Sequence, residues 1–294
     1  MSKVKVAAAQ YDIGFFKDWS QFTDKLTQWV AEAVEEKAKL LVFPEYGSME
    51  LASLFGETIY TDLGKQLHSM QDVYADWQDL HHQLCKQYDV MMLASTFPVL
   101  QEDGTFRNRA NLYGPDGLIG FQDKLIMTRF ENEQWLIHPG QQIKVLDTDV
   151  GRIGVSICYD IEFPMITYQQ VKAGADLILA PSCTDTQAGF HRVRIGCQAR
   201  ALENQCYVVQ SPTFGEARWS EAVDVNTGRA SIYTPVDYGF TDNGILIEGV
   251  ADKPGWVCAD LDLAEIARVR EEGQVFNYRD WPLQHTLTGP EQIR

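Results

Sequence analysis

The sequence lacks paired cysteines of the kind that hold zinc or build a disulfide framework. Its six cysteines are scattered along 294 residues, and no two of them form a C-x-x-C pair. Metal sites and disulfide scaffolds are recognised by short, regular cysteine spacings. We therefore expect neither, and we expect no metal or other cofactor. The cysteines are Cys85, Cys158, Cys183, Cys197, Cys206 and Cys258.

Basic residues are scarce relative to acidic ones. The chain has 25 Lys and Arg against 41 Asp and Glu, so its formal net charge is −16. This charge repels phosphate backbones, and we expect no nucleic acid partner. The sequence also has no apolar run of membrane-spanning length, and its first residues enter a strand pattern without the features of a secretory signal. We expect a cytoplasmic protein with no membrane partner.

Internal repeats, low-complexity segments and a convincing linker are missing as well. Although the length allows two domains, we interpret residues 1–294 as one α/β domain, with 265–294 as a C-terminal arm. After Gly273 the arm is rich in proline and polar residues, and we expect it to be extended. Alternating helices and apolar strands predict layered sheets flanked by helices. The predicted strands are 4–10, 40–43, 90–97, 109–113, 119–122, 143–146, 151–158, 177–180 and 207–211, and the predicted helices are 19–39, 67–88, 164–174 and 193–205.

Three reactive side chains stand at predicted strand ends. Cys158 follows the apolar run 151–157, Glu45 follows the run 40–44, and Lys124 comes just past a short strand. A side chain at a strand end is held rigidly and is still reachable. A thiol, a carboxylate and an amine placed in this way could serve as nucleophile, base and oxyanion partner.

Five motifs occur in a recognisable order. They are residues 41–45 (Leu-Val-Phe-Pro-Glu), 123–125 (Asp-Lys-Leu), 151–160 (Gly-Arg-Ile-Gly-Val-Ser-Ile-Cys-Tyr-Asp), 174–176 (Gly-Ala-Asp) and 199–204 (Ala-Arg-Ala-Leu-Glu-Asn). Together they resemble the nitrilase superfamily of carbon–nitrogen hydrolases, over Val4 to about Leu263. Residues 128–131 (Thr-Arg-Phe-Glu) and 181–186 (Pro-Ser-Cys-Thr-Asp-Thr) are similar to a poorly characterised branch of it. Some members of that branch also carry an acetyltransferase-like domain, which these residues do not contain.

The resemblance implies an α-β-β-α sandwich, and a homodimer or a larger even-numbered oligomer that extends it. It also implies catalytic roles for Glu45, Lys124 and Cys158. Glu45 would accept the thiol proton, while Lys124 and the backbone N–H of Tyr159 would stabilise the oxyanion. None of the six histidines has the motif context for catalysis, which argues against a Cys-His protease.

The family places a second glutamate between the lysine and the cysteine, a few positions before the Pro-Gly pair found here at 139–140. Both Glu131 and Glu133 are available, and the spacing is longer than usual, as if a short insertion were present. We favour Glu133 as the fourth catalytic residue, with Glu131 as the alternative and as a candidate substrate contact.

The loop 181–186 usually forms a wall of the pocket in this family. Thr184 and Asp185 would make that wall polar and acidic, which suits a substrate with hydroxyl, amide or ammonium groups. The alternative is a loop held by local side-chain bonds to the backbone. Glu162 follows the nucleophile closely, and we expect it, like Tyr159, to contact the substrate.

The function favoured by this pattern is hydrolysis of a small amide through a cysteine thioester, with release of ammonia or an amine. A nitrilase acting on a nitrile is the closest alternative, because the same triad serves both reactions. An acyltransferase that uses the same thioester is a further variant. A non-catalytic scaffold that kept the fold would be favoured only if a triad member were missing, and none is.

Overall fold

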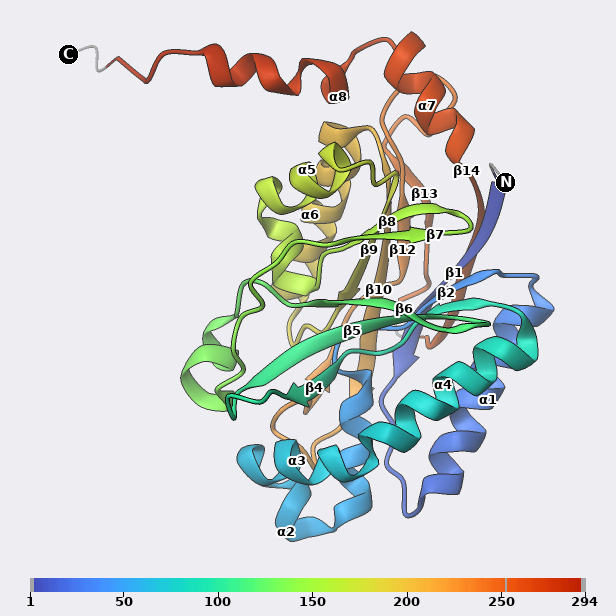
Figure 1. Cartoon of the computed structure of the whole chain (residues 1–294), viewed down its shortest axis with the longest axis vertical. Helices are drawn as coiled ribbons and strands as arrows, with labels where there is room; N and C mark the ends of the chain where they lie inside the picture. The colour runs from blue at the N-terminus through green and yellow to red at the C-terminus, as the bar shows by residue number, and fades with distance from the viewer. Residues whose placement is uncertain (1–2, 252, 292–294) are drawn as a thin grey trace.

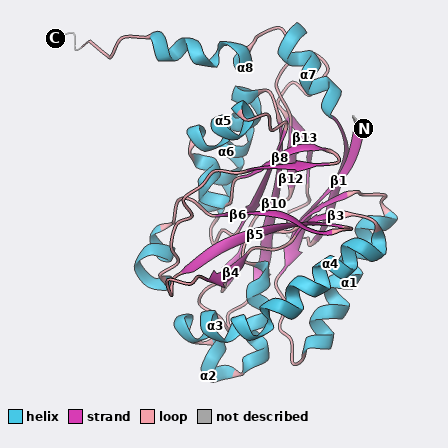
Figure 2. Cartoon of the chain, in the orientation of Figure 1, coloured by secondary structure: helices cyan, strands magenta, loops and turns pink. Residues whose placement is uncertain are grey.

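Strands fill the centre of the molecule and helices cover their outer faces, as Figures 1 and 2 show for the computed structural model. The structure describes residues 3–251 and 253–291. The strands are β1 (Lys3–Asp12), β2 (Leu40–Val42), β3 (Met91–Leu93), β4 (Phe97–Leu100), β5 (Phe106–Gly114), β6 (Gly117–Asp123), β7 (Val145–Thr148), β8 (Gly151–Val155), β9 (Leu177–Ser182), β10 (Tyr207–Glu216), β11 (Val225–Asn226), β12 (Ser231–Tyr233), β13 (Ile245–Glu248) and β14 (Gly255–Asp262). The α-helices are α1 (Trp19–Glu35), α2 (Glu57–Tyr60), α3 (Leu63–Met70), α4 (Tyr74–Tyr88), α5 (Pro164–Lys172), α6 (Gln187–Asn204), α7 (Leu263–Glu272) and α8 (Asn277–Asp280). Shorter helical turns cover Gly47–Phe55, Gln71–Val73, Glu131–Trp135, Cys158–Glu162 and Trp281–Thr286.

The strands follow the order β4-β5-β3-β2-β1-β10-β9-β8-β7 and form two sheets that meet at one corner. β1 pairs in parallel with β2 and antiparallel with β14 along most of its length. Only its last residues, Tyr11 and Asp12, pair with β10, which belongs to the second sheet with β7, β8 and β9. The two sheets therefore face each other, and the predicted α-β-β-α sandwich is confirmed.

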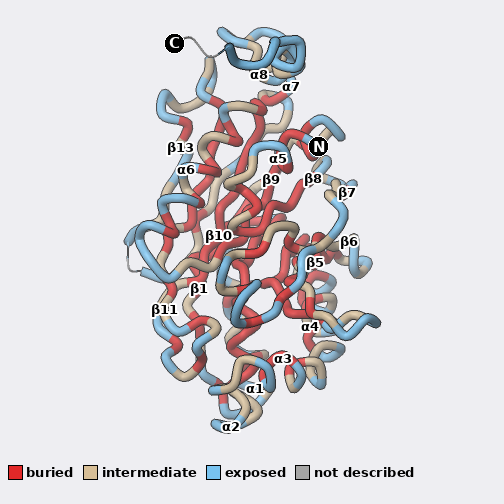
Figure 3. The backbone as a smooth tube through the Cα atoms, turned by 90° about the vertical axis from the view of Figure 1, so that its left-hand side faces the viewer, coloured by how far each residue is buried: buried red, intermediate tan, exposed pale blue. Residues whose placement is uncertain are grey.

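The side chains of β1 alternate between two apolar clusters, which explains why layers form on both faces of the sheet. Val6 and Ala8 belong to the apolar cluster between the sheets, while Ala7 and Ala9 belong to the cluster beneath the helices. Successive strand residues point to opposite faces, so a strand that is apolar at every position is buried on both. Helix α1 covers the outer face with a stripe that includes Leu26. Figure 3 shows these strands as the buried centre of the molecule.

Two predicted elements are divided in the structure. The predicted helix 67–88 is split into α3 and α4 by the tight turn Gln71–Val73, and the predicted strand 90–97 is split into β3 and β4. Between β3 and β4 the chain turns to contact the end of β2. There the Thr96 N–H donates to the Pro44 carbonyl, and the Thr96 hydroxyl accepts from the Tyr46 N–H. This break in the strand therefore supports the segment that carries Glu45.

The C-terminal arm begins later than predicted. Residues 265–272 lie in α7, where Ile266 and Val269 are fully buried, so this part belongs to the body of the protein. Beyond Gly273 the chain projects sideways, and it forms short helical turns rather than an extended strand (Figure 1). Residues 292–294 of the predicted arm lie outside the described residues. Within 3–251 and 253–291, no helix is long and apolar enough to cross a membrane.

Candidate active site

Cys158 lies in the turn that follows β8. The strand ends at Val155, three residues earlier than predicted, and Cys158 begins the helical turn Cys158–Glu162. Its φ of 49° is in the left-handed region, which a residue with a side chain rarely adopts. Strain of this kind persists where the surroundings impose it, often at functional sites. The residue is 4% exposed, and its Sγ lies 3.6 Å from the Cys183 carbonyl oxygen.

A buried amine lies between two buried carboxylates. The Lys124 Nζ donates to Glu45 Oε1 at 2.8 Å and to Glu131 Oε2 at 2.7 Å. Glu45 comes from the segment after β2, Lys124 follows β6, and Glu131 begins the next helical turn. Glu45 Oε1 also accepts from the Asn108 amide at 2.9 Å. The structure thus brings Glu45 to Lys124, 79 residues away, while Glu131 lies only seven residues beyond the lysine.

The structure corrects the choice between the two glutamates. Glu133 is half exposed and bonds to Arg129, whereas Glu131 is buried and bonds to Lys124. The turn Glu131–Trp135 is a π-helix closed by the Leu136 N–H, which donates to the Glu131 carbonyl. The Ile137 N–H donates to the same carbonyl at 3.0 Å. This wide turn accommodates the extra residues before the Pro-Gly pair and directs Glu131 inward.

Further hydrogen bonds fix the inward carboxylate. The Tyr46 hydroxyl donates to Glu131 Oε1 at 2.7 Å, and both the N–H and the hydroxyl of Thr128 donate to Oε2 at 2.8 Å. Sequence reasoning missed Tyr46, Thr128 and Asn108. Tyr46 could have been found because it directly follows Glu45, and Thr128 because it opens the branch motif 128–131. No sequence signal pointed to Asn108.

The two carboxylates differ in acidity although they share one amine. Burial raises the pKa of Glu45, and the Lys124 charge does not fully offset it. Burial opposes ionisation of Glu131 too, but the Lys124 charge and the bonds from Thr128 and Tyr46 hold its pKa below the usual range. Burial and the Glu45 charge raise the pKa of the Cys158 thiol. Glu45 is thus the stronger base of the two, beside a thiol that needs one.

These groups line a cavity of about 750 Å³. All five predicted substrate contacts line it: Tyr159, Glu131, Glu162, Thr184 and Asp185. Glu162 is 3.5 Å from Arg192, a lining residue that the sequence did not reveal.

The two residues of the predicted acidic wall differ in their bonding. The Thr184 hydroxyl donates to the Thr227 carbonyl at 2.7 Å, so it secures the loop through a partner 43 residues away rather than through the local bonds of the alternative interpretation. The exposed Asp185 has no ion-pair partner among the described residues and remains a candidate for binding substrate.

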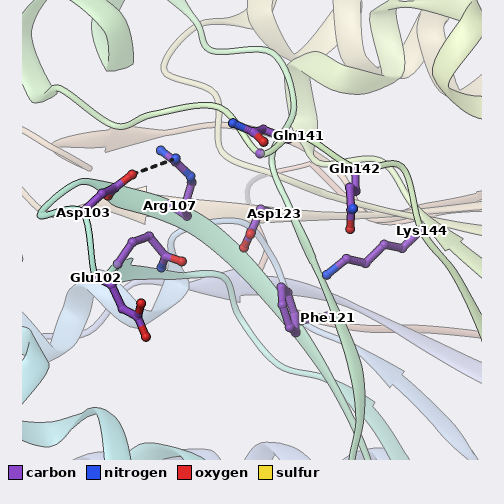
Figure 4. Close-up of a pocket in the computed structure, with 10 residues that line it drawn as sticks. Glu102, Asp103, Arg107, Phe121, Asp123, Gln141, Gln142 and Lys144 are labelled. Atoms are coloured by element: carbon purple, nitrogen blue, oxygen red, sulfur yellow. Dashed lines mark ion pairs between the residues drawn. The ribbon is translucent and has the colours of Figure 1, made fainter.

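A second cavity, of about 610 Å³, lies beside the end of β6 (Figure 4). Arg107 faces Asp103 on one side at 3.7 Å, and the Lys144 ammonium lies 3.3 Å from the centre of the Phe121 ring on the other. No cysteine is among its lining residues, whereas Cys158 and Cys183 line the first cavity. Among residues 3–251 and 253–291, no cluster of His, Cys, Asp and Glu side chains is arranged to hold a metal ion.

Comparison with known proteins adds sequence relatives. The family model described as carbon-nitrogen hydrolase matches residues 5–271. "Probable hydrolase YhcX" of Bacillus subtilis (strain 168) is 32% identical over 277 residues, which cover 94% of this chain and 53% of that protein. The chain thus spans about half the length of that relative. "Omega-amidase NIT2-B" of Xenopus laevis is 24% identical over 281 residues, 92% of this chain and 93% of that protein.

Solved structures share the fold. Nit3 of Saccharomyces cerevisiae, described as a member of branch 10 of the nitrilase superfamily, has a TM-score of 0.73 at 22% identity and covers 92% of this chain and 94% of its own. A mutant of the amidase from Nesterenkonia sp. AN1 has a TM-score of 0.69 at 22% identity, covering 91% of this chain and 94% of its own. In that amidase the acetamide moiety of fluoroacetamide is added covalently to the active-site cysteine.

Proposed function

The chain belongs to the carbon–nitrogen hydrolase family, and from this premise we propose that it cleaves the C–N bond of a small amide through a thioester on Cys158. The observation that carries the proposal is the Lys124 amine held 2.8 Å from Glu45 and 2.7 Å from Glu131, in the cavity that the thiol lines. The cavity thus holds a nucleophile, a base and a buried cation together.

Acylation begins with proton transfer from the Cys158 thiol to Glu45 as the sulfur attacks the amide carbon. Because the pKa of Glu45 is raised, this carboxylate accepts the proton more readily than Glu131. The negative charge that develops on the carbonyl oxygen is stabilised by Lys124 and by the Tyr159 N–H. Glu45 then gives its proton to the nitrogen, the C–N bond breaks, and ammonia or an amine leaves a thioester behind.

Hydrolysis of the thioester reverses these proton transfers. Glu45 takes a proton from a water molecule as the water oxygen attacks the thioester carbon, and Lys124 again stabilises the oxyanion. When the C–S bond breaks, the sulfur recovers the proton from Glu45 and the carboxylic acid is released. Glu131 stays ionised throughout and holds the ammonium of Lys124 in place.

An amide is favoured over a nitrile as the substrate. The amidase and omega-amidase activities given for relatives support this choice. The mouth of the cavity carries Asp185, Glu221 and Asp224, which have no ion-pair partners among the described residues. This rim supports a substrate that carries a polar or cationic tail.

The proposed enzyme is a homodimer or a larger even-numbered oligomer. Helices α5 and α6 expose Met165, Ile195 and Leu202, and the projecting arm exposes Leu283 and Leu287. A self-complementary contact through these residues would bury the apolar side chains of the helices and those of the arm.

We also propose a cytoplasmic location. All six cysteines are free in the structure, which supports a reducing compartment.

Ammonia release from a panel of amides, ureido acids and nitriles tests the function. We expect the wild type to hydrolyse an amide, and mass spectrometry of the quenched reaction to find the acyl group on the Cys158 peptide. Cys158→Ala should fold normally and lose nearly all turnover. An acyl group carried by Cys183 with Cys158 unmodified, or hydrolysis of nitriles alone, would contradict the proposal.

A further inference from the structure

The Asp160 carboxylate connects two segments that carry catalytic groups. It is fully buried and accepts three backbone N–H groups. Its Oδ1 accepts from Leu125 at 3.1 Å and from Ile126 at 2.8 Å. Its Oδ2 accepts from Leu125 at 3.1 Å and from Ile157 at 3.3 Å.

These donors stand next to the reacting side chains. Leu125 directly follows Lys124, and Ile157 directly precedes Cys158. One carboxylate therefore fixes the backbone beside the amine relative to the backbone beside the thiol. The bond from Ile157 also closes the turn that holds Cys158 at its positive φ.

The negative charge of the Asp160 carboxylate lowers the stability of the folded protein. Burial raises the pKa of Asp160 to about 7, although the Lys124 charge and the three N–H donors oppose the shift. In the folded protein the charged form is therefore disfavoured relative to its state in water. A group that lowers stability in this way and joins two catalytic segments suggests a role in activity rather than in folding.

We propose that Asp160 is a positioning residue that sets the distance between the Cys158 sulfur and the Lys124 amine. The inference rests on the proposed function, because it assumes that these two groups act on one substrate. Removing the carboxylate leaves the N–H groups of Leu125 and Ile126 without their acceptor, and this segment can then move away from the cysteine turn.

The test compares wild type with Asp160→Asn and Asp160→Ala. Asparagine keeps the volume and one acceptor oxygen, but its amide brings donors toward N–H groups; alanine removes both acceptors. We expect kcat to fall between about 10-fold and about 10²-fold, most in the alanine variant, since a shift near 1 Å has such an effect. KM should change little. The rate of Cys158 alkylation by iodoacetamide should fall in the same order as kcat.

Asp237 provides a matched control. Its carboxylate also accepts three backbone N–H groups, from Tyr238, Gln274 and Val275, and joins two chain segments, but it does not line the catalytic cavity. Asp237→Asn should lower the unfolding temperature and leave both kcat and the alkylation rate as in wild type.

The alkylation endpoint separates positioning from stability. In a positioning role, every folded Asp160→Asn molecule is alkylated at Cys158, only more slowly. Two results would overturn the proposal. One is an unchanged kcat and alkylation rate in Asp160→Asn. The other is that only a fraction of the Asp160→Asn molecules can be alkylated, that this fraction reacts at the wild-type rate, and that its size accounts for the loss of activity. If alanine prevents folding, the isosteric Asp160→Asn decides. Failure of wild-type Cys158 to react at all would instead overturn the proposed function.

Discussion

The two candidates for the second glutamate, Glu131 and Glu133, are best distinguished by neutralising them singly. Glu131→Gln should lower kcat by about 10²-fold, because the variant loses the charge that holds Lys124 in place. Glu133→Gln, two residues away on the exposed side of the same turn, should retain wild-type kinetics. Steady-state ammonia release from both variants measures the difference. A larger loss in Glu133→Gln would restore the interpretation that the sequence favoured.

His81 gives the fold a pH dependence of its own. The ring is buried on α4, and its Nδ1–H donates to the Trp77 carbonyl at 2.7 Å. Burial lowers the pKa of His81 to about 4, against an ordinary value of 6.5. Between these values the unfolded chain binds more protons than the folded protein, so the free energy of unfolding falls as the pH falls through this window.

Urea unfolding at pH 7 and pH 5 measures this contribution. His81→Gln keeps a side-chain donor but cannot titrate. The drop in the free energy of unfolding between the two pH values should be smaller in this variant by about 2 kcal/mol. An identical drop in wild type and variant would mean that the His81 ring is protonated in the folded state at pH 5.

At the scale of elements, the loop between β9 and α6 serves two purposes at adjacent positions. Thr184 bonds to Thr227, and Thr186 caps α6 by accepting from the Gly189 N–H. These bonds hold the loop, while Asp185 lies between them on the cavity wall without an ion-pair partner among the described residues. The helix cap thus fixes the place of a free carboxylate at the cavity mouth.

Asp185→Asn tests whether this carboxylate selects the substrate. For an amide with an amino group on its tail, kcat/KM should fall roughly 10-fold, because a bond to a charged group is worth about 1.5–3 kcal/mol. A matched amide without the amine should be affected far less. Thr184→Val, which removes the loop bond, serves as the control for general disturbance. Equal losses for both amides in Asp185→Asn would make Asp185 structural.

For the whole molecule, oligomeric state is the property to measure. Light scattering at micromolar concentration should give a dimer or a larger even-numbered assembly. Ile195→Asp, on the exposed side of α6, should shift it toward monomer because burying a carboxylate at an apolar contact is unfavourable. Leu118→Asp, at an exposed apolar position on β6, should not. A strictly monomeric and fully active wild type would contradict the prediction.

The sequence alone determined the layered fold and the positions of Cys158, Glu45 and Lys124. Both follow from local signals. Apolar strands that are buried on both faces need helices outside them, and a reactive residue that follows a strand closely is held near the edge of the sheet. The catalytic roles of the three residues remain proposals, although the structure places them around one cavity.

Only the tertiary structure decided which glutamate contacts the lysine, where the strand before Thr96 breaks and what Asp160 holds. Each depends on at least one partner that is distant in sequence. Glu131 turns inward because Tyr46 and Lys124 receive it there, and Asp160 finds the N–H groups of Leu125 and Ile126 more than thirty residues away. A periodic sequence pattern indicates which face of an element is buried. It does not indicate which polar group a buried side chain on that face will contact. These hydrogen bonds form, and contribute to the free energy of folding, only once the layers have packed.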